Sequence, residues 1–189
     1  NLPAFFLATI SEERIFPGEI NNNKFTVSLR NYPERRNKSL VLFDFDSKQS
    51  QFIPSYSLFN PILNEAIYSL EDRDRTLLKR DFNLDTVWQY KIESSASYLS
   101  LRYAFIDKGL FITFIGPAEE CMQVVNGNQE KSFSGGQLMG FSDVDGSVVW
   151  QLEVPNAVDD IKQVGSELFI SSLSEILIVN AQTGVLLHT

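Results

Sequence analysis

The side chains best suited to covalent or acid–base chemistry in this sequence are a single histidine and a single cysteine, His188 and Cys121. A Ser-His-Asp or Cys-His pair for nucleophilic catalysis could be built only around His188. His188 is the penultimate residue and lies on a predicted edge strand, where we expect a structural role. Cys121 has no second cysteine for an internal disulfide, so the fold does not depend on cross-links.

Acidic residues are the remaining candidates for a metal or acid–base site. Residues 143–146 read Asp-Val-Asp-Gly, which begins like a calcium-binding loop. Such a loop would need an oxygen ligand where Phe141 stands and a glutamate where Leu152 stands, so we interpret the segment as a hairpin turn. The pairs 119–120 and 159–160 are predicted to be solvated loop acids, because sequence neighbours rarely face each other across a cleft. We predict no catalytic, cofactor-binding or metal-binding residue.

Charge and hydropathy exclude two kinds of partner. The chain holds 24 acidic and 16 basic residues, which gives a net charge of −8. A nucleic-acid surface needs clustered lysine and arginine, and the basic cluster at residues 35–38 is predicted to be a hairpin tip. The longest apolar runs, such as residues 4–8, are far too short to cross a membrane. We therefore expect neither a nucleic-acid partner nor a membrane span in this segment.

Four aromatic residues mark a repeat along the chain. Each stands in a short apolar segment, four positions after a residue that favours a turn. The marks are Phe25, Tyr68, Phe111 and Phe169, and the turn residues are Asn21, Asn64, Asp107 and Gly165. The marks are 43, 43 and 58 residues apart. This spacing predicts that the marks occupy equivalent places in four successive sheets.

A second turn closes each repeated unit, at residues 47–48, 84–85, 145–146 and 183–184. No segment of twelve or more residues shows a helical apolar period with caps. Four units of four short strands predict an all-β protein, a β-propeller of about four blades of four antiparallel strands that stands alone or is part of a larger propeller. We place the blades at about residues 12–54, 55–94, 95–155 and 156–189 of one domain. The alternative is a β-sandwich with irregular hairpins.

The third unit carries about twenty extra residues, at positions 117–136. They include an apolar patch formed by Cys121, Met122, Val124 and Val125, and a polar stretch follows it. Loops on a rigid scaffold often carry binding, so these four residues are candidates for contact with another protein. The alternative is an elongated hairpin that has no partner.

Two segments of the chain resemble the repeats of the pyrroloquinoline-quinone-like (quinoprotein-like) β-propellers. They are residues 145–151, Asp-Gly-Ser-Val-Val-Trp-Gln, and residues 180–187, Asn-Ala-Gln-Thr-Gly-Val-Leu-Leu. In that family the third strand of a blade ends in Asp or Asn, a Thr-Gly turn follows, and a Trp closes the fourth strand. This chain departs from the pattern at Ser142, which takes the Asp place, and at Phe52 and His188, which stand where Trp would.

The resemblance implies an architecture more strongly than a function. Similar propellers act as non-catalytic scaffolds that contact other proteins during assembly or sensing, and we expect this role here, without a cofactor. The alternative is a fragment of a quinone-dependent oxidoreductase. That class uses a calcium site and often adjacent cysteines, and the lone Cys121 excludes such a pair. The compartment stays open, although the resemblance favours the periplasm or the lumen of the endoplasmic reticulum.

The motif residues also have local structural roles. Gly146 and Gly184 are predicted to supply a positive φ at a tight hairpin, and Asn180 to bond the turn backbone. Trp88 and Trp150 are predicted to pack on the neighbouring blade while their N–H groups find a carbonyl. All of these roles concern the fold rather than chemistry.

Assembly is the last expectation from the sequence. Four blades are few for a closed ring of this kind, so the sheet edges near residues 5–9 and 185–188 would be left unpaired. Exposed edges with apolar faces recruit another chain. We therefore expect the chain to pair with a second copy or to belong to a longer chain that supplies more blades.

Overall fold

The structure is a computed structural model of the whole chain. It describes residues 13–21, 23–31, 38–54, 61–71, 75–93, 99–117, 120–125, 128–133, 135–156, 158–172 and 175–189. These residues form only strands and turns, so the predicted all-β class is confirmed, and none of them lies in a helix that could cross a membrane. Residues 5–9 and 35–37, named in the sequence analysis, lie outside the described part. The chain divides into two compact units, Asn1–Ile92 and Glu93–Thr189.

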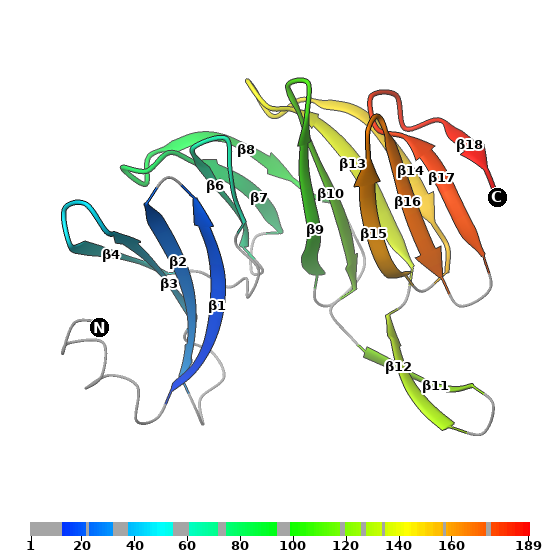
Figure 1. Ribbon diagram of the computed structural model, residues 1–189, viewed down its shortest axis with the longest axis horizontal. Helices are drawn as coiled ribbons and strands as arrows, with labels where there is room; N and C mark the ends of the chain where they lie inside the picture. Colours follow the sequence, from blue (N-terminus) through cyan, green and yellow to red (C-terminus); the bar gives the residue numbers. More distant parts are fainter. Residues whose placement is uncertain are drawn as a thin grey trace. The chain divides into compact units, whose positions relative to one another are not determined.

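The first unit contains two four-stranded antiparallel sheets, which we call the first and second sheets (Figure 1). The first sheet consists of β1 (Glu13–Asn21), β2 (Lys24–Asn31), β3 (Lys38–Asp44) and β4 (Gln49–Pro54). The second sheet consists of β5 (Ile62–Leu63), β6 (Ala66–Glu71), β7 (Thr76–Arg80) and β8 (Thr86–Lys91). In both sheets the spatial order of the strands follows the sequence.

The second unit repeats this arrangement in a third and a fourth sheet. The third sheet consists of β9 (Leu99–Asp107), β10 (Leu110–Pro117), β13 (Gly136–Ser142) and β14 (Val148–Val154). The fourth sheet consists of β15 (Val158–Val164), β16 (Glu167–Ser172), β17 (Ile176–Asn180) and β18 (Leu186–His188). A separate hairpin of β11 (Glu120–Val125) and β12 (Asn128–Phe133) is inserted between β10 and β13.

Apolar side chains fill the space between the sheets of each unit. In the first unit Leu42 of the first sheet packs with Ile62 and Ile67 of the second. In the second unit a larger core joins the third sheet to the fourth. Its buried members are Leu110, Ile112, Phe114, Leu138, Trp150, Val154, Val158, Ile161, Leu168, Ile170, Leu177, Val179 and Ala181. Burial of this apolar surface is what holds one sheet on the next.

The four aromatic marks lie in equivalent strands but not at equivalent positions. All four fall in the second strand of their sheet, as predicted. Phe25 and Phe111 are the second residues of β2 and β10, whereas Tyr68 and Phe169 are the third residues of β6 and β16. A shift of one residue moves a side chain to the opposite face of a strand. The predicted positional equivalence is therefore wrong by one residue in the second and fourth sheets.

The turns between the third and fourth strands all contain a residue with a positive φ. Gly146 and Gly184 have positive φ angles of 73° and 68°, which confirms the predicted role of these glycines. Lys48 holds the same place in the first sheet, with φ of 56°, and Leu84, with φ of 73°, ends the turn of the second sheet, which is one residue shorter. A positive-φ residue is thus kept in all four sheets, although two of them carry a residue for which this region is less favourable.

Candidate functional site

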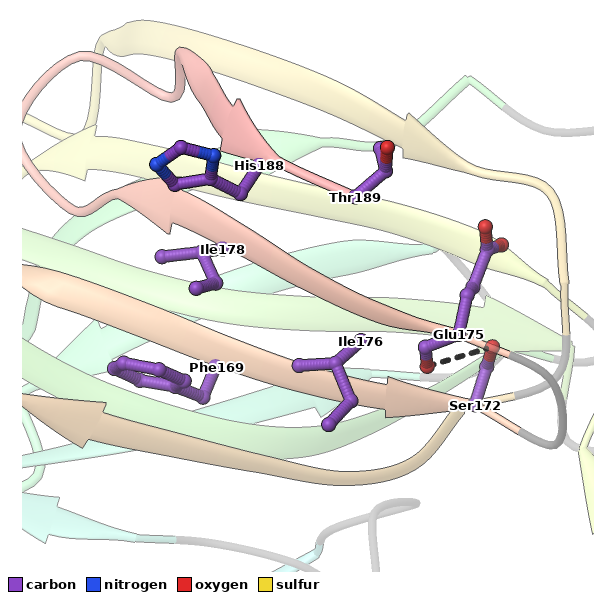
Figure 2. A pocket seen from close by; sticks show the side chains of 7 residues that line it. All are labelled: Phe169, Ser172, Glu175, Ile176, Ile178, His188 and Thr189. Carbon is purple, nitrogen blue, oxygen red and sulfur yellow. Dashed lines mark hydrogen bonds between the residues drawn. The ribbon is translucent and has the colours of Figure 1, made fainter.

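An open groove lies on the face of the fourth sheet that points away from the third sheet (Figure 2). We call it the β18 groove, and its volume is about 590 Å³. Its lining residues are Phe169, Ser172, Glu175, Ile176, Ile178, His188 and Thr189. Most of this lining is apolar, which suits contact with another apolar surface.

Strand alternation explains which side chains reach the groove. Phe169, Ile178 and His188 are paired across β16, β17 and β18, so they form one row on one face. Their neighbours Leu168 and Val179 point the other way and are fully buried in the core shared with the third sheet. The fourth sheet is therefore apolar on both faces, and only one of the two faces is covered by the third sheet.

Polar groups at one end of the groove are held by local hydrogen bonds. The Ser172 hydroxyl donates to the backbone carbonyl of Glu175 at 3.3 Å, and Asn156 Nδ2 donates to the Glu175 carboxylate at 2.7 Å. The serine hydroxyl is thus directed at a carbonyl rather than at the His188 imidazole.

Trp150 shows how one sheet packs on the next in this chain. Its indole Nε1 donates to the Ala181 carbonyl of the fourth sheet at 3.1 Å, as predicted for a closing tryptophan. A Cβ added to Gly184 would lie 2.5 Å from the Trp150 ring, and so would a Cβ added to Gly140. The ring is therefore clasped between a glycine of its own sheet and a glycine of the following sheet.

Two further polar contacts join the third and fourth sheets. Gln182 Nε2 donates to the backbone carbonyl and to the carboxylate of Asp107, both at 2.9 Å. The Tyr103 hydroxyl donates to the Asp159 carbonyl at 2.9 Å. Burial raises the pKa of Tyr103, and the charge of Asp160 adds to this effect. The phenol is thus held as a neutral hydrogen-bond donor.

His188 takes in the fourth sheet the place that Trp150 takes in the third. Trp150 is paired with Gly140 of β13, and His188 is paired with Ile178 of β17, the equivalent strand. In both sheets the register shifts at this point. The β18 groove therefore occupies the place where, on the third sheet, the next sheet is seated.

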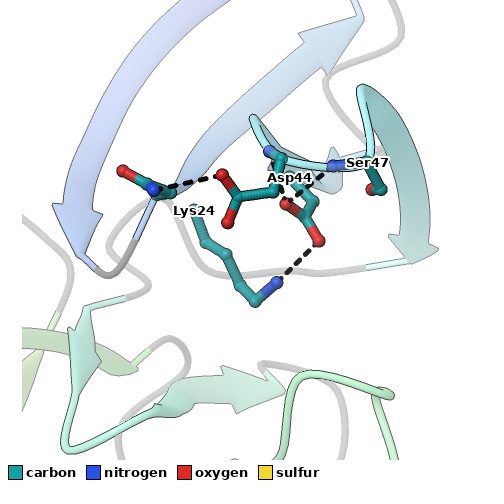
Figure 3. A network of polar contacts seen from close by, with 5 residues as sticks. Lys24, Asp44 and Ser47 are labelled. Atoms are coloured by element: carbon teal, nitrogen blue, oxygen red, sulfur yellow. Dashed lines mark hydrogen bonds and ion pairs between the residues drawn. The ribbon is translucent and has the colours of Figure 1, made fainter.

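A polar cluster in the first sheet was not predicted from the sequence (Figure 3). Lys24 Nζ and Asp44 Oδ2 form an ion pair at 2.8 Å, and the other Asp44 oxygen accepts the backbone N–H groups of Asp46 and Ser47. The hydrogen bond from Lys24 and the backbone bonds lower the pKa of Asp44 from 3.8 to about 2. A carboxyl group this acidic stays ionised at neutral pH, so we assign it to the turn rather than to proton transfer.

The predicted interaction residues lie in the inserted hairpin. Cys121, Met122, Val124 and Val125 all fall in β11. Their partners in β12 are polar: Ser132, Lys131, Gln129 and Asn128. The backbone thus has the form of the elongated hairpin named as the alternative. The side chains lie outside the described residues, so the interaction role of this patch stays a prediction.

The predicted acidic candidates divide into a turn and a strand. Residues 143–146 form the turn between β13 and β14, as predicted, and hydrogen bonds from the Ser147 N–H and hydroxyl lower the pKa of Asp145. Asp159 and Asp160 were predicted to be loop acids, but they lie in β15, because that strand begins earlier than its apolar residues indicate. Glu120 likewise begins β11. Among the described residues, no three His, Cys, Asp or Glu side chains are grouped as metal ligands.

Comparisons with known proteins show similarity of fold. No protein-family model matches the chain, and no curated protein matches it in sequence. A quinohemoprotein alcohol dehydrogenase from Comamonas testosteroni superposes with a TM-score of 0.60 at 9% identity, over 96% of this chain and 37% of that one. A europium-containing methanol dehydrogenase gives a TM-score of 0.56 at 9% identity, over 93% and 42%. The chain has a β-propeller fold.

In this fold the four sheets are blades, and the β18 groove lies on the face of the fourth blade that points away from the third blade. BamB from Moraxella catarrhalis also matches, at 18% identity over 94% of this chain and 62% of that one. Its TM-score is 0.44, and we base no inference on this match. The chain therefore spans between about a third and two thirds of the length of these structures. The predicted blade limits and the closure of a ring stay predictions.

Proposed function

We propose that this chain is a non-catalytic propeller scaffold that binds other proteins during assembly or sensing. The observation that carries the proposal is the β18 groove, an open apolar surface on the fourth blade. Pockets for small ligands are concave and bury most of the ligand surface, whereas an open apolar face suits a protein.

The edge beside the groove supports the same function. Val185, Leu186 and Leu187 are all among the exposed large hydrophobic residues of the chain. Leu186 and Leu187 belong to β18, which is the edge strand of its blade. An exposed edge strand offers unpaired backbone groups next to an apolar face, and both are features that a protein partner can use.

The test is a comparison of three proteins as bait under identical conditions: the unaltered chain, Ile176→Asp in the groove, and Val144→Asp as the matched control. Ile176 and Val144 are both exposed, at 58% and 81%, but Val144 lies in the turn of the third blade. We expect partners that bind the unaltered chain and Val144→Asp equally and bind Ile176→Asp at least tenfold more weakly. Equal binding to all three would contradict the proposal.

The alternative function is a fragment of a quinone-dependent oxidoreductase, and the likeness to two dehydrogenases of this fold is what favours it. Titration with pyrroloquinoline quinone and calcium, followed by calorimetry and by the absorbance of the quinone, separates the two functions. Saturable binding of the quinone, with dye-linked oxidation of an alcohol, would replace the scaffold proposal by this one.

A further inference from the structure

The packing of the third blade on the fourth provides a template with two halves. One half is the outer face of the third blade, with Trp150 projecting from it. The other half is the turn of the fourth blade that receives Trp150, where Ala181 supplies the carbonyl and Gly184 the space for the ring. Each blade can therefore carry an outgoing half and a receiving half of the same interface.

The first blade carries a receiving turn of the same construction, which we call the Phe45 turn (residues 45–48). The Phe45 N–H donates to the Asn23 carbonyl at 2.9 Å, just as the Ala181 N–H donates to the Ser166 carbonyl at 2.8 Å. Lys48 has a positive φ at the place of Gly184, so the backbone is the same, but Lys48 carries a side chain where Gly184 leaves space for a ring. Phe45 is thus the structural equivalent of the residue that accepts the Trp150 hydrogen bond.

Among the described residues, the outgoing half on the fourth blade and the receiving half on the first blade both expose apolar side chains. Phe45 is 45% exposed, and the ring contact described for it is an edge-to-face contact with Phe43, with the ring centroids 5.0 Å apart. At the other end of the chain, Ile176 is 58% exposed in the β18 groove. The fourth blade therefore presents an exposed outgoing face, and the first blade presents an exposed receiving turn of the type that such a face contacts in the template.

Net charge distinguishes two partners for the groove in a second copy, namely its fourth blade and its first unit. The first unit, Asn1–Ile92, holds twelve basic and twelve acidic residues, whereas Glu93–Thr189 holds four basic and twelve acidic residues. The whole net charge of −8 thus lies in the second unit. Contact between two fourth blades would bring two acidic units together, and like charges across an interface are unfavourable. Contact with a first unit has no such cost.

We propose that the β18 groove of one copy docks on the Phe45 turn of a second copy, in a head-to-tail assembly. This inference rests on the proposed function, since it names a second copy of the chain as one partner of the groove. His188 then lies where Trp150 lies in the template, against the backbone of the receiving turn. Head-to-tail contacts of this type produce rings or filaments according to the rotation between copies.

The test uses one substitution in each half, Ile176→Asp in the groove and Phe45→Asp in the turn, with Val144→Asp as the matched control. Sedimentation velocity of the full chain at micromolar concentration measures the mass, and circular dichroism verifies the fold. We expect the unaltered chain and Val144→Asp to associate, and each of the two interface variants to be monomeric. A 1:1 mixture of Ile176→Asp and Phe45→Asp should form a heterodimer, because each retains one intact half.

Three results would overturn the proposal. A monomeric unaltered chain excludes self-association, yet leaves the groove free to bind other proteins, so the proposed function is tested separately by its own bait experiment. Association that survives Phe45→Asp and is lost only in Ile176→Asp means that two grooves meet. A mixture that stays monomeric, with both variants folded, excludes the head-to-tail geometry.

Discussion

Asp44, Asp81 and Asn180 show one side-chain role repeated in three blades. In each case one side-chain oxygen accepts two backbone N–H groups of the following turn, at distances between 2.9 and 3.4 Å. A carboxylate and an amide both satisfy this geometry, because each carries an acceptor oxygen on Cγ, two bonds from Cβ. Asp44 differs from the other two residues in its ion pair with Lys24.

The ion pair of Asp44 predicts a pH dependence of stability. The pKa of Asp44 is lowered from 3.8 to about 2 in the folded chain, so the folded state holds this proton less tightly than the unfolded state does. The stabilisation is therefore complete above the unfolded pKa and is lost as the pH falls through about 2. Titration of the Asp44 carboxyl carbon by NMR should give a midpoint near the lowered value.

Lys24→Met supplies the control for this assignment. The variant removes the largest cause of the shift and leaves the hydrogen bonds from Asp46 and Ser47 in place. We expect the pKa of Asp44 to rise part of the way towards 3.8, and acid unfolding to begin at a higher pH. An unchanged midpoint would mean that the backbone hydrogen bonds alone set the acidity of Asp44.

Trp150→Phe tests the hydrogen bond between blades. The variant replaces the indole by a smaller phenyl ring and removes the indole N–H, which leaves the Ala181 carbonyl without this donor. Loss of a buried hydrogen bond of this kind costs about 1–3 kcal/mol. Urea unfolding should show this loss, whereas Val149→Ala, at a 52% exposed neighbour in β14, should change stability by less than about 0.5 kcal/mol. Equal effects would show that the hydrogen bond contributes little.

At the scale of the element, the turn between the third and fourth strands keeps a positive-φ residue in all four blades, although its sequence varies. Glycine stands at the positive-φ position in two blades, and lysine and leucine stand there in the other two. Space explains part of this difference, since the Trp150 ring leaves no room for a Cβ at Gly184. The glycine of the fourth blade is thus required by its neighbour as well as by its own backbone.

Gly184→Ala and Gly165→Ala separate these two requirements. Both glycines have a positive φ, but a Cβ at Gly165 would meet nothing within 4 Å. We expect Gly165→Ala to cost about 1 kcal/mol, the backbone effect alone. Gly184→Ala should cost about 1–3 kcal/mol more in urea unfolding, because the ring must shift. Equal losses in the two variants would show that Trp150 moves aside without strain.

Turn and strand spacing predicted the elements well, because the four strands of a blade need little more than short apolar runs between turns. The prediction that the four aromatic marks hold equivalent positions was wrong by one residue in two of the blades. Tyr68 and Phe111 are both fully buried, although they point to opposite faces of equivalent strands. Either face of a blade can therefore be buried, so an aromatic residue is accepted on either face and its type does not report the register.

The candidate site was the harder part to predict. His188 was placed correctly on an edge strand, but the groove beside it depends on which blade faces are covered, and one sequence does not contain that information. Phe169 illustrates the difficulty. It served as a mark of the repeated unit, and it lines the groove because its face is not covered by the third blade.

At the scale of the whole molecule, the chain divides into two compact units. The second unit, Glu93–Thr189, contains two blades and a continuous core that runs from Leu110 to Ala181. A unit with its own core can in principle fold alone. The two units also differ in charge, which makes the second unit the strongly acidic half of the chain.

We expect residues 93–189, expressed alone, to fold. The fragment should show a β-type circular dichroism spectrum and a cooperative unfolding transition in urea. Leu168→Ala in the same fragment provides the control, since loss of this fully buried side chain should destabilise it by about 2–5 kcal/mol. A fragment without a cooperative transition would mean that the second unit depends on the first for its stability.

The hairpin of β11 and β12 enters and leaves the third blade between β10 and β13, which pair directly with each other across its base. Because the ladder closes beneath the insertion, the blade does not need the hairpin for its own hydrogen bonds. Sequence at this point can lengthen, shorten or diverge without a cost to the sheet. The chain therefore has a place where evolution, or a protein engineer, can attach a new recognition element to an unchanged scaffold.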